Sequence, residues 1–466
     1  MQSPLKLTLL SLLISTAVPS AFAEGTQPTP ESNILGFTAA LELAKQNDPE
    51  LKYAFYSYKA DQEADDLSLS QLLPRVSASS SYRYSLVDDY YTEFKDQGTN
   101  PEQVETNPAR YNEEQDDYSF QLRMQQSLVN VAAWKDYSSS KESVKSAQFN
   151  YSRAEQELIY RLSQAYLKAL LAGQQVSINQ EKLEALQLKL EQTQRMDELG
   201  VGDRLSVLKV ASSRDIAKSD LLQAQSEFED AKTQLDIITG THVELPQSWL
   251  EHGQQVIPNL QKGSQSDWMN KVLENTKLLS EQSNVRSQEL LVQSRSAQHL
   301  PTLDFTLTAI DRHAEDIYQD STNYVASVDL TIPIYSGGQT SSRARQAEAS
   351  YNAAQARYEK TLLDIQQTVK LAYAQLNSYR GRLLALDESR KSSQAFLEAA
   401  ERQADLSLSS QVDVLEARTD LYDVRLKFAQ TLADYLLSDL NLLLETGQLT
   451  EQTLKEYDEL FSRTTL

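Results

Sequence analysis

The sequence predicts an α+β membrane protein that combines four amphipathic strands per chain with very long α-helices, arranged as an internal structural duplication. Three observations support this prediction. Four segments alternate apolar and polar residues with a period of two, two long segments without proline have helical composition, and the same order of features occurs twice. Four strands cannot close a barrel in lipid, so the chain must assemble with further copies of itself.

The first 23 residues are expected to be a secretory signal peptide. Lys6 supplies the positive charge, residues 7–18 form the apolar core, and Ala21-Phe22-Ala23 is a small-x-small cleavage site. The apolar run is too short for a transmembrane anchor and is interrupted by serine and threonine. We therefore expect the chain to be exported.

Composition limits the possible chemistry. The net charge of −22 disfavours nucleic acid and anionic lipid as partners, although acidic residues also solvate long helices. Cysteine is absent, and the four histidines lack metal-ligand spacing. No nucleophile paired with a base and no phosphate-binding glycine loop is found. We assign no catalytic residue, no metal, no cofactor and no nucleic-acid partner.

The duplication divides the mature chain. A shift of 207 residues aligns Tyr151 with Tyr358 and Thr239-Gly240 with Thr446-Gly447 without a gap. The front of each half needs a longer shift, because polar residues 88–117 are expected to form a larger loop than their counterpart, residues 311–323. The expected units are a first repeat at 24–240, an equatorial linker at 241–266, a second repeat at 267–447 and a C-terminal periplasmic tail at 448–466.

The strands are expected at about 75–86, 117–128, 302–310 and 323–334. Pro74 and Pro301 stand at the starts of the first and third strands. Their length suits a tilted strand crossing a hydrocarbon layer, with the apolar face toward lipid. A half-buried sheet in a soluble sandwich shows the same alternation, but the charges on the second face, among them Arg83 and Asp304, favour the membrane. Two copies would give eight strands and three would give twelve, and a conducting pore favours three or more.

Each half continues from its second strand into long helices. In the second half Pro333 ends strand pairing, since it has no N–H, and Gly337-Gly338 lets the chain turn into the helix. In the first half "NVAAW", ending at Trp134, does the same without glycine. The expected helices are 135–198, 206–238, 339–405 and 411–445. Matching apolar stripes predict a packed seam; they contain Leu158, Leu162, Ala165, Ala169, Ile365, Val369, Ala372 and Leu376.

Taken together, these motifs resemble the TolC family of outer-membrane efflux ducts. The resemblance rests on the signal peptide, the Leu-Pro strand starts, the Pro333-x-x-x-Gly337-Gly338 junction and Val412-Asp413-Val414-Leu415 after the helix break, and it covers essentially the mature chain. It implies a homotrimer in which a twelve-stranded β-barrel in outer-membrane lipid continues into a periplasmic α-helical tunnel. It also implies a periplasmic adaptor protein and an inner-membrane transporter as partners, and a passive exit function in efflux or type I secretion.

The resemblance also suggests an entrance site. It implies a carboxylate ring at the periplasmic entrance, formed here by Asp413 and Glu416, which share a helix face three residues apart. A solvated helix surface would show the same spacing. The family's closing tyrosine, arginine and aspartate positions are occupied here by Ala404, Ser409 and Ser206, so the closing contacts must differ or the entrance is looser.

Two other functional classes were considered. A secreted or periplasmic coiled-coil scaffold would explain the helices and the acidity, but not four amphipathic strands at duplicated positions. An independent porin is disfavoured because one chain has too few strands. The cargo is left open, since drugs, bile-salt-like amphiphiles and a secreted protein would leave similar sequences.

Overall fold

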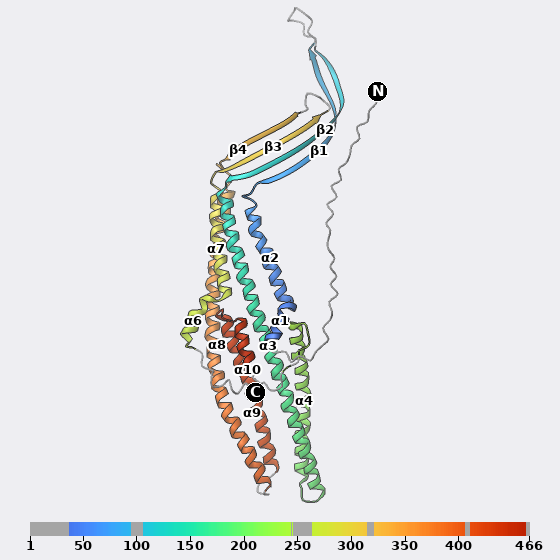
Figure 1. The fold of residues 1–466 in the computed structure, drawn as a ribbon, viewed down its shortest axis with the longest axis vertical. Helices are drawn as coiled ribbons and strands as arrows, with labels where there is room; N and C mark the ends of the chain where they lie inside the picture. The colour runs from blue at the N-terminus through green and yellow to red at the C-terminus, as the bar shows by residue number, and fades with distance from the viewer. Residues whose placement is uncertain are drawn as a thin grey trace, which may run out of the picture.

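The computed structural model describes residues 37–94, 106–243, 245, 263–314, 321–405 and 411–462, which form an elongated molecule with a sheet at one end (Figure 1). Within these ranges no helix has the length and apolar content needed to cross a bilayer. The elements in chain order are α1 (Phe37–Asn47), α2 (Pro49–Leu69), β1 (Arg75–Phe94), β2 (Thr106–Val129), α3 (Val131–Glu198), α4 (Arg204–Thr239), α6 (Gln265–Lys271), the 3₁₀ turn η2 (Val272–Glu274), α7 (Thr276–Ala297), β3 (Thr302–Ala314), β4 (Ser321–Thr331), α8 (Gln339–Asp405), α9 (Gln411–Glu445) and α10 (Glu451–Ser462).

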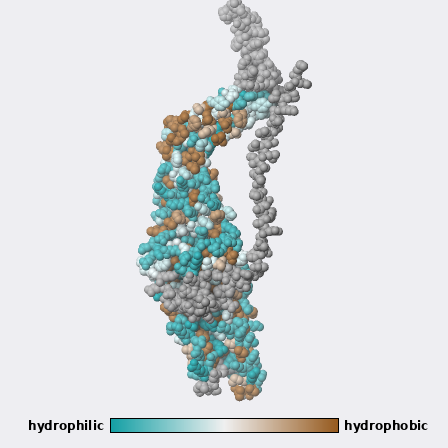
Figure 2. Space-filling model, viewed as in Figure 1, coloured by the Kyte–Doolittle hydropathy of each residue, from teal (hydrophilic) through white to brown (hydrophobic). Residues whose placement is uncertain are grey.

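The four strands form one antiparallel sheet in the order β1-β2-β3-β4. The apolar side chains of the alternating pattern lie exposed along it, among them Val76, Tyr82, Leu122, Val328 and Leu330. Figure 2 shows hydrophobic side chains gathered over this end, above helices with mostly hydrophilic surfaces. Since β1 and β4 form the two edges, each chain offers a strand for pairing at both sides of its sheet.

The first hairpin is longer than the sequence predicted. Residues 88–117 were expected to be a polar loop, but β1 and β2 pair continuously from Arg75–Gln125 to Phe94–Thr106. That expectation was wrong for residues 88–94 and 106–117. The backbone N–H and C=O groups of two paired strands form hydrogen bonds with each other whatever side chains the strands carry. In the second hairpin β3 continues to Ala314, four residues beyond its expected end. β4 begins two residues earlier than expected, at Ser321, and also ends three residues earlier, at Thr331.

Two helices, α3 and α8, run down most of the molecule (Figure 1). They contain 68 and 67 residues, which correspond to about 100 Å each. The Asn130 side chain caps α3 by accepting a 3.0 Å hydrogen bond from the Ala133 N–H. The expected junction segment ending at Trp134 is therefore the cap and first turn of α3, and the helix begins four residues earlier than expected. Helix α8 covers the expected range.

The helices of one chain form a curved wall. In the upper half α2 contacts α3, α3 contacts α7, and α7 contacts α8; in the lower half α4 pairs with α3 and α9 with α8. Small side chains allow α3 and α7 to approach closely: Ser146 Oγ donates to the Ser280 carbonyl at 2.9 Å, and Ser280 Oγ donates to the Ser146 carbonyl at 3.1 Å. The helices at the two sides of this wall match the edges of the sheet. Helices α2 and α4 lie on the side of β1, and α8 lies on the side of β4 (Figure 1).

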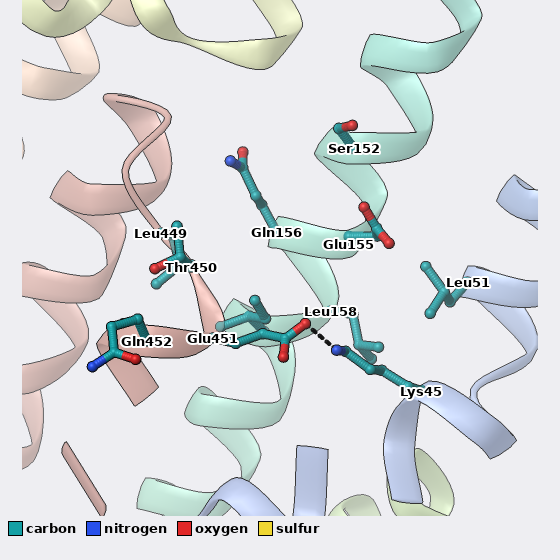
Figure 3. A pocket seen from close by; sticks show the side chains of 11 residues that line it. Lys45, Leu51, Ser152, Glu155, Gln156, Leu158, Leu449, Thr450, Glu451 and Gln452 are labelled. Atoms are coloured by element: carbon teal, nitrogen blue, oxygen red, sulfur yellow. Dashed lines mark hydrogen bonds and ion pairs between the residues drawn. The ribbon is translucent and has the colours of Figure 1, made fainter. Parts of the chain in front are cut away.

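The main core lies halfway down the molecule. The predicted apolar stripes of both long helices are buried there, which confirms the seam. Around it lie α1, α6 and α10 (Figure 1). The C-terminal segment was expected only as a tail, but Leu449, Leu454 and Tyr457 are buried in this core. At the surface of this core, Lys45 of α1 forms an ion pair with Glu451 of α10 (Figure 3).

The duplication also extends to the contacts at this level. Asp48 caps α2 and Asn275 caps α7, each accepting a hydrogen bond from the backbone N–H three residues later. The neighbouring Asn47 amide donates to the Thr239 carbonyl at 2.8 Å, and the Asn275 amide donates to the Glu445 carbonyl at 3.0 Å. Each lower helix therefore ends against the cap of an upper helix of its own repeat.

Raising the pH above about 10 is expected to destabilise the packing of α10. Burial and the hydrogen-bonded Asp439 carboxylate raise the pKa of Tyr457 well above its ordinary value. The folded chain keeps this proton where the unfolded chain loses it, so this contribution to stability is complete below about pH 10 and is lost as the pH rises further. Thermal denaturation at about pH 8 and pH 11 measures the loss, which should be smaller in Tyr457→Phe; equal losses would contradict the assignment.

Candidate entrance of the tunnel

The end of the molecule opposite the sheet is formed by two helical hairpins, α3 with α4 and α8 with α9 (Figure 1). In the first hairpin Gly200 adopts a left-handed conformation with a φ of 75°, and Asp203 caps α4. In the second hairpin α9 begins at Gln411. The turn of the first hairpin lies between the helices that the sequence predicted at 135–198 and 206–238.

Asp413 and Glu416 lie in the first two turns of α9 and are both exposed. Their spacing places them on the same side of the helix, as the sequence suggested. Asp413 is in the first turn, where the helix dipole favours a negative charge. This end of the chain therefore presents two carboxylates to solvent.

The structure also brings cations to these hairpins. Lys209 of α4 forms an ion pair with Glu416, with 3.0 Å between Nζ and Oε1. Further up, Arg425 of α9 pairs with Glu181 of α3 at 2.8 Å. Leu415 packs against apolar clusters formed by α3 and α4. These contacts were not predicted from the sequence. A signal for one of them is present, because Lys209 and Glu416 are equivalent under the 207-residue shift.

Of the three altered closing positions, Ser206 and Ala404 lie in the described part of the chain, and neither forms a comparable link between the hairpins there. Ser206 Oγ donates to Asp203 Oδ2 of its own helix end at 3.3 Å. Ala404 lies near the end of α8 and has no polar side-chain atom. Ser409 lies outside the described residues. Any polar tie that the described chain makes between its hairpins therefore comes from other side chains.

The residues predicted at the junctions lie between sheet and helices. Pro74 and Pro301 immediately precede β1 and β3. β4 and its pairing end at Thr331, two residues before Pro333. Gly337 and Gly338 have φ angles of 62° and 81° just before α8. A side chain at either glycine would be strained by this backbone conformation.

The described part of the chain contains no arrangement of side chains that is typical of an enzyme active site. No group of three or more His, Asp or Glu within the described ranges could hold a metal ion. The groove in Figure 3, between α1, α3 and the segment before α10, has Lys45 directed toward Glu451 and Glu155 on its α3 wall. These groups join helices and form no nucleophile-and-base arrangement.

A four-stranded sheet with apolar exposed side chains, two edges for pairing and a long helical extension with charged tips defines a channel-forming outer-membrane protein. Comparison with known proteins agrees. The chain belongs to the outer membrane efflux protein family, which matches residues 40–241 and 268–448.

Relatives and solved structures extend this result. The chain is 24% identical to the proteases secretion protein PrtF of Dickeya chrysanthemi, covering 97% of this chain and 94% of that protein. It is 25% identical to the outer membrane protein TolC of Escherichia coli strain K12, covering 91% and 84%. The outer membrane channel CmeC of Campylobacter jejuni superposes with a TM-score of 0.72 at 16% identity, covering 95% and 94%.

The resemblance to the TolC family and the expected fold class are therefore confirmed. The chain has the fold in which four strands per chain complete a trimeric twelve-stranded β-barrel above a periplasmic α-helical tunnel. It is an outer-membrane exit channel of the efflux protein family. Its location is the bacterial outer membrane, with a periplasmic extension.

Proposed function

We propose that this chain is a passive duct without catalytic activity, and that it works as a homotrimer with a periplasmic adaptor protein and an inner-membrane transporter. Efflux of small amphiphiles and secretion of a protein both fit this arrangement. Two relatives are named for protease secretion, which supports a secretion role without identifying the cargo. Energy for transport comes from the partners, because the chain offers no nucleotide-binding motif.

The placement of Asp413 and Glu416 is the observation that supports a selective entrance. Both carboxylates are exposed at the end of the molecule farthest from the sheet. In a trimer, three chains bring three such pairs around one opening. Crowded like charges attract cations and repel anions, so the entrance selects by charge while the wide tunnel contacts cargo only loosely.

Replacing both residues, as Asp413→Ala/Glu416→Ala, is expected to reduce cation preference and to weaken block by Mg²⁺ about tenfold. Conductance of the purified protein in planar bilayers measures both. The matched control is Asp420→Ala/Asp423→Ala, which removes two exposed carboxylates with the same spacing farther along α9. An entrance variant that behaves like the control would remove the carboxylate ring from the proposed function.

A further inference from the structure

Lys209 and Glu416 occupy equivalent positions in the two repeats but carry opposite charges. The duplication places Lys209 in α4 where Glu416 stands in α9, and the structure joins them by a 3.0 Å ion pair. Both side chains are about half exposed, at 51% and 65%. Equivalent positions of the two repeats therefore supply the two partners of the ion pair, the cation from α4 and the anion from α9.

Among the described residues, few other contacts join the hairpins at this end. Within each hairpin the two helices pack along their length, whereas between the hairpins the main helix contact is α3 with α9. Leu415, the residue next to Glu416, supplies the apolar part of the joint. It packs against two apolar clusters, one that contains Leu183 and one that contains Leu190 and Val207.

A second ion pair lies farther from the tip. Arg425 is nine residues along α9 from Glu416, about 14 Å away, and pairs with Glu181 of α3. Arg418 pairs with Glu401, but this contact stays within the α8–α9 hairpin. Lys209 is therefore the cation that ties α9 to α4 nearest the two carboxylates.

An exposed ion pair usually contributes little, about a twofold shift in an equilibrium. Two features raise its effect here. The contact area between the two hairpins is small, so the ion pair is a large part of it. A trimer contains three copies, and three pairs that break together shift the equilibrium between closed and open entrances about tenfold. Ser206 and Ala404, the described positions that the family resemblance suggested for closure, carry no charge to replace it.

We infer that Lys209 masks the Glu416 carboxylate and fastens the α3–α4 hairpin to the α8–α9 hairpin at the entrance. Lys209 is then a specificity-determining residue, because the entrance presents fewer uncompensated negative charges than its carboxylates alone suggest. This inference rests on the proposed function for its effect on conduction, but the contact itself is a separate claim.

Lys209→Gln tests the effect on conduction. In planar bilayers the variant should conduct about tenfold more at rest, because the tie is lost. Mg²⁺ should block it at about fivefold lower concentration, because removing a nearby positive charge exposes Glu416. Lys218→Gln is the matched control, because it removes an exposed charge from the same helix and Lys218 forms no ion pair with another described residue. The inference is overturned if both lysine variants behave alike.

A charge exchange tests the pairing itself. Lys209→Glu alone should conduct more than Lys209→Gln, since two carboxylates then face each other. Lys209→Glu/Glu416→Lys should conduct less at rest than Lys209→Glu, because the exchange restores an ion pair of reversed polarity. A doubly exchanged channel that stays as open as Lys209→Glu would show that the two side chains do not interact.

Crosslinking separates this contact from the proposed function. The chain has no cysteine, so Lys209→Cys/Glu416→Cys introduces the only two thiols. A short bismaleimide should link them within one protomer, whereas Lys218→Cys/Glu416→Cys, whose first thiol lies nine residues farther along α4, should not react. Failure of the 209–416 pair to crosslink overturns the contact. Efficient crosslinking together with unchanged cation preference in Asp413→Ala/Glu416→Ala would instead overturn the carboxylate ring and leave the contact standing.

Discussion

Gly447→Ala is expected to destabilise the folded chain by about 3 kcal/mol or more, lowering the apparent melting temperature on the order of 5 °C. Gly447 follows α9 and has a φ of 70°, a conformation that costs an L-residue about 1–2 kcal/mol. A Cβ atom there would also lie 2.4 Å from the Glu274 carbonyl oxygen. This oxygen belongs to the backbone of η2, so relief requires moving the turn before α7 away from the end of α9.

The control separates backbone strain from the clash. Gly200 has a similar φ of 75°, but no atom lies within 4 Å of the Cβ that alanine would add. Gly200→Ala should therefore cost only the strain, about 1 kcal/mol. Circular dichroism during heating of the detergent-solubilised protein compares the two. Equal shifts would mean that the contact with Glu274 does not hold the two helices together.

Much of this fold could be predicted from periodicity alone. The strands and long helices were found because alternation with a period of two and proline-free helical composition are local signals. The equivalence of Thr239-Gly240 with Thr446-Gly447 located both ends of the lower helices, where the structure has left-handed glycines. The resemblance to one family then gave the assembly that local signals could not specify.

The misses have physical causes. The outer part of the first hairpin has loop-like composition, and only backbone pairing between β1 and β2 makes it a sheet. Helix α10 is short and is fixed by burial of Leu454 and Tyr457 against distant helices, which composition does not show. At the entrance, Asp413 and Glu416 were predicted because they match a family motif. Lys209 matches no motif, and its ion pair could be suspected only by comparing its position with that of Glu416 in the other repeat.

The second large effect is expected where the two repeats are joined by a buried ion pair. Arg153 of α3 and Glu445 of α9 have side chains only 12% and 14% exposed, and they approach to 2.9 Å. Arg153 also donates to the Leu444 carbonyl, and the Asn275 amide donates to Glu445. Burial opposes the charge, yet the Glu445 and Glu157 carboxylates raise the pKa of the Arg153 guanidinium above its ordinary value. The network thus connects α3, α7 and α9 at the level of the main core.

Glu445→Ala should cost about 3 kcal/mol, because it leaves the Arg153 guanidinium buried without its main counter-charge. Arg402→Met, which breaks an exposed pair with Glu398, should cost less than about 0.5 kcal/mol and serves as the surface control. The double variant Arg153→Met/Glu445→Leu removes both charges and should recover most of the loss, since apolar groups of similar volume replace a buried pair at little cost. Heating curves of the three variants measure these differences. If the double variant is as unstable as Glu445→Ala, the loss comes from packing or from the Asn275 hydrogen bond, and the unpaired charge is not its cause.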